Sequence, residues 1–109
     1  EKEDHFGEHA SGRNSGVIHS GFNLPPETMK AKFCVEGSKF LRDYCREKDI
    51  DMNECGTLVV ARNAEEEDTI QELYRRGLAN KVPGLKIISD QELKELEPGV
   101  VGYKALFYV

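Results

Sequence analysis

Residues 11–21 (SGRNSGVIHSG) hold the residue types of this chain that are best suited to chemistry. The small side chains Ser11, Gly12 and Gly21 let backbone amides approach a ligand closely. Arg13, with Asn14 and Ser15, adds hydrogen-bond donors of the kind that bind phosphate oxygens. The segment therefore predicts an anion-binding loop. An ordinary surface turn has the same composition, so the residue types alone leave both interpretations open.

The remaining candidate ligands do not form a recognisable metal or disulfide pattern. His5 and His9 are four residues apart, but no third or fourth ligand lies at useful spacing. Cys34, Cys45 and Cys55 are odd in number and lack Cys-x-x-Cys spacing, which favours a reducing compartment. On one helix, Cys34 and Cys45 would lie about 16 Å apart, so we expect core thiols there and no bridge.

The charge and hydropathy of the chain exclude two classes of partner. The 109 residues carry a formal net charge of -5, with the basic residues scattered among acids, so no nucleic-acid partner is expected. No apolar run approaches the ~20 residues that span a bilayer, and no signal peptide opens the chain. We expect a soluble cytoplasmic protein, or one in peripheral contact with a membrane.

The elements that must position the loop are predicted from periodicity. Residues 1–26 predict mostly loop, with at most a helical turn. An amphipathic helix is expected over 27–47, begun by Pro25 and Pro26, with Cys34, Ser38, Leu41 and Cys45 on one face. Short strands are expected over 51–54 and 57–61.

The second half alternates between the two kinds of element. Asn63 predicts the N-cap of a helix over 64–79, and residues 85–88 predict a strand. Ser89 and Glu92 form a capping-box pattern for a short helix, and 103–109 predicts a last strand. The expected class is α+β, with mixed helices and strands.

The loop and much of the chain after it resemble the L-2-hydroxyglutarate dehydrogenase/oxidase family, which belongs to the D-amino-acid-oxidase-like flavoproteins. The likeness begins at SGRNSGVIHSG and continues in order through KAKFCVEG (30–37), CGTLVVA (55–61), GLANKVPGL (77–85) and ELEP (95–98).

The resemblance implies a two-domain flavoprotein with FAD on a Rossmann-type half. Residues 1–50 would belong to the FAD-binding domain and residues 51–109 would begin the substrate-binding domain. Glu1 would hold the adenosine ribose, and the loop from Arg13 to Ser15 would lie along the pyrophosphate and ribityl chain. Ser11 and Gly12 would also bind the cofactor, and His19 and Gly21 would reach the flavin ring. The glycine-rich turn of the first strand would precede this chain, so we expect an internal fragment that is inactive alone and binds FAD weakly.

The implied activity of the parent is oxidation of an α-hydroxy acid such as L-2-hydroxyglutarate by hydride transfer to FAD. His19 is the candidate catalytic residue beside the flavin, through a non-covalent contact. The expected partners are the small hydroxy-acid substrate, the rest of the polypeptide and, at a membrane, a quinone. Two alternatives stay open: a glycerol-3-phosphate dehydrogenase-like flavoenzyme, and a self-sufficient α+β module that binds an anion without catalysis.

Overall fold

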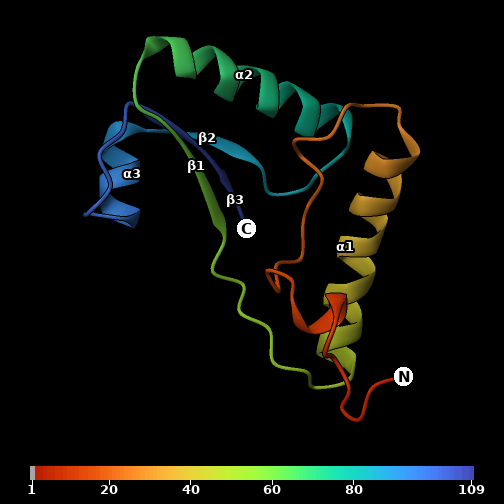
Figure 1. Cartoon of the computed structure of the whole chain (residues 1–109). Coiled ribbons are helices and arrows are strands. Elements are labelled where there is room, and N and C mark those ends of the chain that lie inside the picture. Colours follow the sequence, from red (N-terminus) through yellow and green to blue (C-terminus); the bar gives the residue numbers. More distant parts are fainter. Residues whose placement is uncertain (1) are drawn as a thin grey trace.

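The structure, a computed structural model, describes residues 2–109 and combines three α-helices with one small sheet (Figure 1). The element order is a 3-10 turn η1 (Ala10–Gly12), α1 (Met29–Glu47), β1 (Thr57–Ala61), α2 (Ala64–Ala79), β2 (Lys86–Ser89), α3 (Asp90–Leu96) and β3 (Lys104–Tyr108). The predicted mixture of helices and strands is confirmed. Residues 2–50 contain no strand, so the strands of a Rossmann-type half are not among the described residues.

The sheet is antiparallel, with β3 in the centre and the order β1-β3-β2. Both β1 and β2 are antiparallel to β3, so they are parallel to each other. Helix α2 connects them in a β-α-β crossover, and β3 lies between the two strands. Leu106 pairs with Val59 on one side and with Ile87 on the other.

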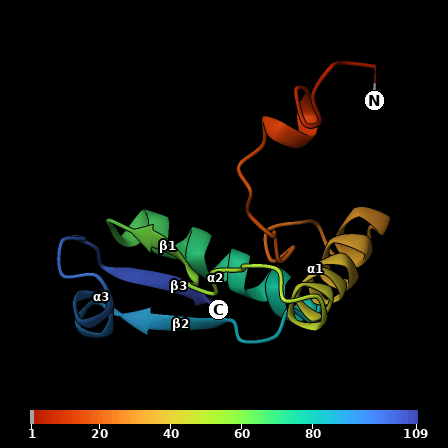
Figure 2. The ribbon, with the colours of Figure 1, turned by 90° about the horizontal axis from the view of Figure 1, so that it is seen from below.

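The two faces of the sheet are covered by different helices (Figure 2). Leu106 and Tyr108 pack with Ile70 of α2, and Ala105 packs with Leu93 of α3. Successive side chains of a strand point to opposite faces, so β3 supplies both small cores.

The helix and strand predictions after residue 56 agree closely with the structure. Helix α2 spans 64–79 as expected, and the side chain of Asn63 accepts a hydrogen bond from Glu66 N at 2.9 Å. The capping box of Ser89 and Glu92 is present at the start of α3. The predicted strands 85–88 and 103–109 are found at 86–89 and 104–108.

The predicted start of the first helix was wrong. The helix begins at Met29, with Thr28 as N-cap, because Glu27 has a φ of 64° and so cannot continue a right-handed helix. Thr28 Oγ1 accepts a hydrogen bond from Ala31 N at 3.1 Å and donates to Pro25 O at 2.8 Å. The two prolines therefore form the turn before the helix.

The strand predicted at 51–54 was also wrong, since these residues form an extended linker without a pairing strand among residues 2–109. Their acidic and amide side chains have low strand preference.

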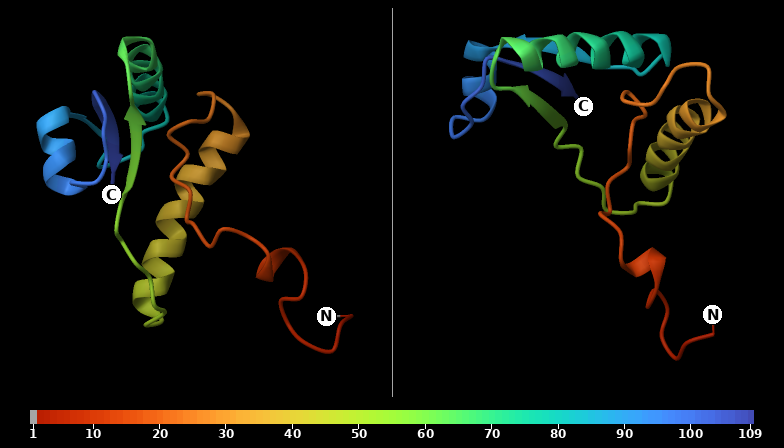
Figure 3. Two further views of the ribbon diagram at one scale, coloured as in Figure 1. Left: turned by 60° about the vertical axis from the view of Figure 1, so that its left-hand side comes forward. Right: turned by 45° about the horizontal axis from the view of Figure 1, so that its top comes forward.

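Helix α1 stands away from the sheet and packs on the loop that precedes it (Figure 3). On its predicted inner face Ser38 is buried and Cys34 and Cys45 are half-buried, whereas Leu41 is 46% exposed, so the expected core face was correct only in part. All three cysteines are free thiols, and none of the described helices is long and apolar enough to cross a membrane.

Candidate functional site

The loop 11–21 is shaped by hydrogen bonds within itself. Asn14 Nδ2 donates to Ala10 O at 3.2 Å and to Ser11 O at 2.8 Å, while Asn14 Oδ1 accepts from Gly16 N at 2.8 Å. The amide of Asn14 is thus occupied in holding the turn. The Asn14 amide therefore positions the neighbouring residues. It could bind a ligand directly only if these hydrogen bonds within the loop were broken.

Gly12 allows the turn to close on an earlier part of the chain. A Cβ at residue 12 would lie 1.7 Å from Gly7 O, so any larger residue would displace the backbone. Gly12 N and Arg13 N both donate backward, to His9 O and Ala10 O. Their amides are therefore not free to bind an anion while η1 is intact.

Several polar side chains of the loop are exposed to solvent. Ser11, Arg13 and Ser15 are exposed, and the guanidinium of Arg13 has no hydrogen bond or ion pair among residues 2–109. An unpaired guanidinium with an exposed serine two residues away on either side can bind a phosphate or carboxylate. The exposed side chains of the loop therefore support the anion-binding interpretation more than its backbone amides do.

The segment 19–21 turns from this exposed loop into the protein. His19 is exposed, while its carbonyl accepts a hydrogen bond from Cys34 Sγ at 3.5 Å. Gly21 is buried with a φ of 86°, and a Cβ there would lie 3.3 Å from atoms of Cys34 and Val35. The backbone is therefore fixed against α1, while the imidazole of His19 stays available to a ligand.

Two residues that the sequence did not single out tie this segment to α2. Asn80 Nδ2 donates to Gly21 O at 3.1 Å and to Leu24 O at 2.9 Å, and Arg76 Nη1 donates to Asn23 O at 3.2 Å. They are more than fifty residues from the loop in sequence, so no local pattern could have indicated them.

Arg76 is itself positioned by a carboxylate on the same helix. Glu72 accepts hydrogen bonds from Arg75 and, at 3.0 Å, from Arg76 Nε. These two guanidinium groups lower the pKa of Glu72 from 4.5 to about 2. Glu72 therefore stays charged at any ordinary pH and keeps Arg76 oriented toward the loop.

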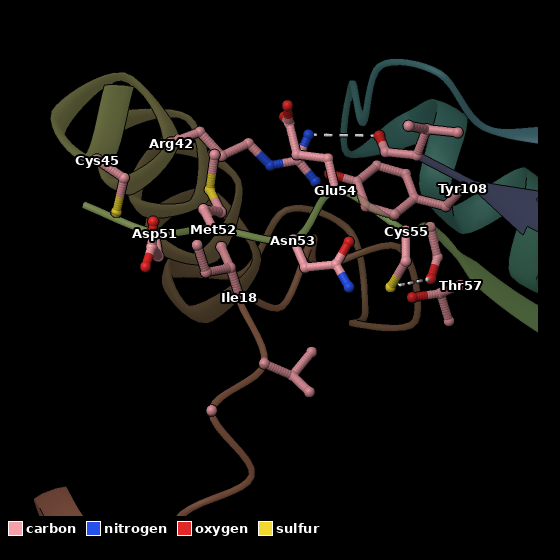
Figure 4. Close-up of a pocket in the computed structure, with 14 residues that line it drawn as sticks. Ile18, Arg42, Cys45, Asp51, Met52, Asn53, Glu54, Cys55, Thr57 and Tyr108 are labelled. Atoms are coloured by element: carbon pink, nitrogen blue, oxygen red, sulfur yellow. Dashed lines mark hydrogen bonds between the residues drawn. The ribbon is translucent and has the colours of Figure 1, made fainter. Parts of the chain in front are cut away.

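A pocket of about 380 Å³ lies where the loop meets the linker to the sheet, and it is lined by Gly16–Ile18 and by residues 51–57 (Figure 4). Arg42 lies beside Tyr108 in this pocket, with its guanidinium carbon 5.0 Å from the ring centroid. Arg42 Nη1 also donates to Val109 O at 3.3 Å. Arg42 thereby links α1 to the end of β3.

Glu1 and the histidines near the start of the chain complete the candidate ligands. Glu1, the predicted ribose ligand, lies outside the described residues. His9 Nε2 lies 2.8 Å from Glu3 Oε1, and no group of three or more metal-ligating side chains occurs among residues 2–109.

Comparison with known proteins decides the family. The model of the FAD-dependent oxidoreductase family matches residues 1–109. The chain belongs to this family. Curated relatives resemble the chain over nearly its whole length.

The human mitochondrial L-2-hydroxyglutarate dehydrogenase is 46% identical over 97% of the chain, which covers 23% of that protein. The L-2-hydroxyglutarate dehydrogenase of Indibacter alkaliphilus is 41% identical, again over 97% of the chain and over 27% of that protein. The chain therefore spans about a quarter of the length of these relatives.

A solved flavoprotein shares the fold. The dithionite-reduced L-α-glycerophosphate oxidase of Mycoplasma pneumoniae, solved with FAD bound, matches with a TM-score of 0.73 and 31% identity. The match covers 87% of this chain and 26% of the oxidase. Family membership and the resemblance to L-2-hydroxyglutarate dehydrogenases are thus confirmed, while the roles of single site residues remain predictions.

Proposed function

We propose that the intact protein containing this chain is an FAD-dependent enzyme that oxidises an α-hydroxy acid such as L-2-hydroxyglutarate to the keto acid. The observation that carries the proposal is the 46% identity to the human L-2-hydroxyglutarate dehydrogenase over 97% of the chain. On this proposal the 109 residues are an internal part of the enzyme and are inactive alone.

The residues of the loop fit an FAD molecule. The unpaired guanidinium of Arg13, with the exposed hydroxyls of Ser11 and Ser15, provides positive charge and donors for the pyrophosphate and ribityl oxygens. Gly12 and Asn14 hold the turn that presents them. In this proposal Glu1 binds the adenosine ribose, as acids at the corresponding place do in dinucleotide-binding folds.

His19 and Gly21 stand at the ring end of the proposed cofactor path. FAD, when bound, accepts the hydride from the carbon that carries the substrate hydroxyl. The exposed imidazole of His19, whose backbone is fixed by Cys34, is the candidate to contact the substrate and to hold its hydroxyl proton. Gly21 allows the backbone to pass close to α1, which leaves the outer side of the segment to the ring.

We propose that the FAD-binding part ends near residue 50 and that residues 51–109 begin the substrate domain. Two observations support this division. Helix α1 stops at Glu47, and β1 to β3 form one sheet after the extended linker. Arg42 bridges the two parts through Tyr108 and Val109.

The test uses the intact protein. We expect flavin absorbance in the purified enzyme and preferred turnover of L-2-hydroxyglutarate over glycerol 3-phosphate with a redox dye as acceptor. His19→Gln should lower kcat by about a hundredfold if His19 moves the proton. His5→Gln, an exposed histidine in the same segment, is the matched control and should leave turnover unchanged. A protein without flavin, or equal effects of the two variants, would contradict these assignments.

A glycerol-3-phosphate oxidase-like activity is the second candidate, since the structural neighbour is a glycerophosphate oxidase. Its identity of 31% is lower than that of the hydroxyglutarate dehydrogenases, so it is less supported. The self-sufficient anion-binding module is less supported still, because the family model matches the whole chain.

The cellular setting is also a proposal. We propose a cytoplasmic location for the intact protein, or peripheral contact with a membrane where a quinone accepts the electrons. The human relative is named as mitochondrial. Cell fractionation with a salt wash, followed by assay with a water-soluble quinone, tests both points.

A further inference from the structure

The turn 21–24 connects the exposed loop to α1, and one of its side chains lies against the core of the sheet. Phe22 packs against the buried cluster that contains Ile70 of α2. Gly77 of α2 makes room for it, since a Cβ at residue 77 would lie 3.2 Å from Phe22 Cβ. The turn is therefore anchored on the side of the sheet that α2 covers, although it precedes α1 in the sequence.

Three carbonyl groups of this turn accept hydrogen bonds from side chains at the end of α2. Asn80 Nδ2 donates to Gly21 O at 3.1 Å and to Leu24 O at 2.9 Å. Arg76 Nη1 donates to Asn23 O at 3.2 Å, and a charged guanidinium forms a stronger hydrogen bond than a neutral donor. Leu24 N closes the turn on Gly21 O at 3.2 Å. The backbone of the turn is thus held mainly from α2.

Arg76 is held at two points of its guanidinium group. Its Nε donates to Glu72 at 3.0 Å while its Nη1 reaches the turn, and its side chain is only 35% exposed. Arg75 binds the same carboxylate at 2.8 and 2.9 Å, but it makes no hydrogen bond to the turn among residues 2–109. The two neighbouring arginines therefore share one partner and differ in their contact with the turn, which makes them a matched pair for mutation.

The segment 19–21 has a weaker attachment of its own. Among the described residues the carbonyl of His19 accepts only from the thiol of Cys34, at 3.5 Å, and a thiol is a weak donor. His19 is two residues from Gly21, whose carbonyl accepts from the amide of Asn80. The stronger hydrogen bonds that fix the backbone of this segment therefore come from α2.

We propose that Arg76, Asn80 and Phe22 are positioning residues. They act on the flavin through the turn 21–24 and the segment 19–21 before it. This inference rests on the proposed function, in which that segment lies beside the flavin ring and α2 belongs to the substrate domain. Helix α2 then fixes the flavin-facing backbone from the substrate side, and with it the distance between flavin and substrate. A misplacement of about 1 Å can slow a reaction about a hundredfold.

The test compares Arg76→Met with Arg75→Met in the intact protein. Both substitutions remove a guanidinium beside Glu72 and keep a long, unbranched side chain of similar helix preference, but only the first removes a hydrogen bond to the turn. In the protein freed of flavin, Arg76→Met should speed hydrogen exchange at Leu24 N–H about tenfold, because the bond to Asn23 O is lost. Arg75→Met should leave this exchange within about twofold of that in the unaltered protein.

The flavin-bound enzyme shows whether the turn positions the flavin. Arg76→Met should change the visible circular dichroism of the bound flavin. It should also slow flavin reduction by the hydroxy acid, per bound flavin, about tenfold, with KM within about twofold of its original value. Arg76→Lys restores a charged donor and should recover most of this rate, whereas Arg75→Met should match the unaltered protein.

These readouts separate the inference from the proposed function. If the intact protein binds flavin but does not oxidise L-2-hydroxyglutarate, the proposed activity is wrong, and hydrogen exchange with circular dichroism still decides the role of Arg76. If Arg76→Met speeds exchange or lowers the melting temperature but leaves the circular dichroism and the reduction rate unchanged, Arg76 only stabilises the turn and the inference is overturned. Equal effects of the two arginine variants, or an intact protein without flavin, would also overturn it.

Discussion

The amide of Asn80 is predicted to hold the segment 19–24 in place, and Asn80→Asp tests this with almost no change in shape. The substitution replaces one NH2 group, which donates to Gly21 O and Leu24 O at 3.1 and 2.9 Å, by an acceptor oxygen. Each lost bond is worth about 1 kcal/mol, so the loop should open more easily by about 2 kcal/mol, before any repulsion between the new carboxylate and the two carbonyls.

Hydrogen exchange at Leu24 N–H reads this opening directly, because that amide donates to Gly21 O. A loss of about 2 kcal/mol corresponds to about thirtyfold faster exchange, since about 1.4 kcal/mol is a factor of ten. We also expect the intact protein to retain less FAD after gel filtration. Asn23→Asp is the control, since this neighbour undergoes the same chemical change with no side-chain hydrogen bond to lose among the described residues. If Asn80→Asp and Asn23→Asp exchange at the same rate, the amide of Asn80 does not position the loop.

Further predictions concern the elements that support the loop. Gly77→Ala should lower the free energy of unfolding by about 2–3 kcal/mol, because the new Cβ would lie 2.1 Å from a methyl carbon of Leu85, and thermal denaturation would show it. Gly37→Ala, with open space around its position in α1, should instead raise stability by about 0.5–1 kcal/mol in the same assay. Arg75 and Arg76 lower the pKa of Glu72 to about 2. The stabilisation that ionised Glu72 contributes is therefore complete above pH 4.5 and is lost as the pH falls toward 2. In melting curves across this range, Glu72→Gln should show a smaller decrease than the unaltered protein, and parallel curves would refute the assignment.

The features that the sequence predicted well are those that depend on neighbouring residues. The N-cap of α2 at Asn63 and the capping box at Ser89 involve partners three residues away, so their pattern is visible in the chain itself. The strand β3 was also predictable locally, since residues 105–108 are a run of apolar and aromatic side chains. The predicted start of α1 was wrong because Glu27 has a positive φ. Glutamate rarely adopts this conformation, so the sequence does not indicate it.

The residues that hold the candidate site in place could not be predicted, because their partners are distant in the sequence. Arg76 and Asn80 appear in the sequence as the polar end of a helix and the residue after it. The partners of Asn80 and Arg76 lie in a loop near the beginning of the chain, and only the folded packing of α2 beside that loop brings them together. The strand expected at 51–54 failed for a related reason, since a strand needs a partner that local sequence cannot supply.

Two adjacent residues at the end of α2 differ in backbone conformation and in their contacts. Asn80 keeps a helical backbone and its amide reaches the carbonyls of Gly21 and Leu24, whereas Lys81 adopts the left-handed conformation. Because the change of backbone region separates the two side chains, their effects should also separate. Asn80→Asp should loosen the loop and lower the flavin content, whereas Lys81→Asn, which suits the left-handed backbone, should preserve both. A glycine at residue 81 would suit this turn, since a left-handed residue after a helix is usually glycine.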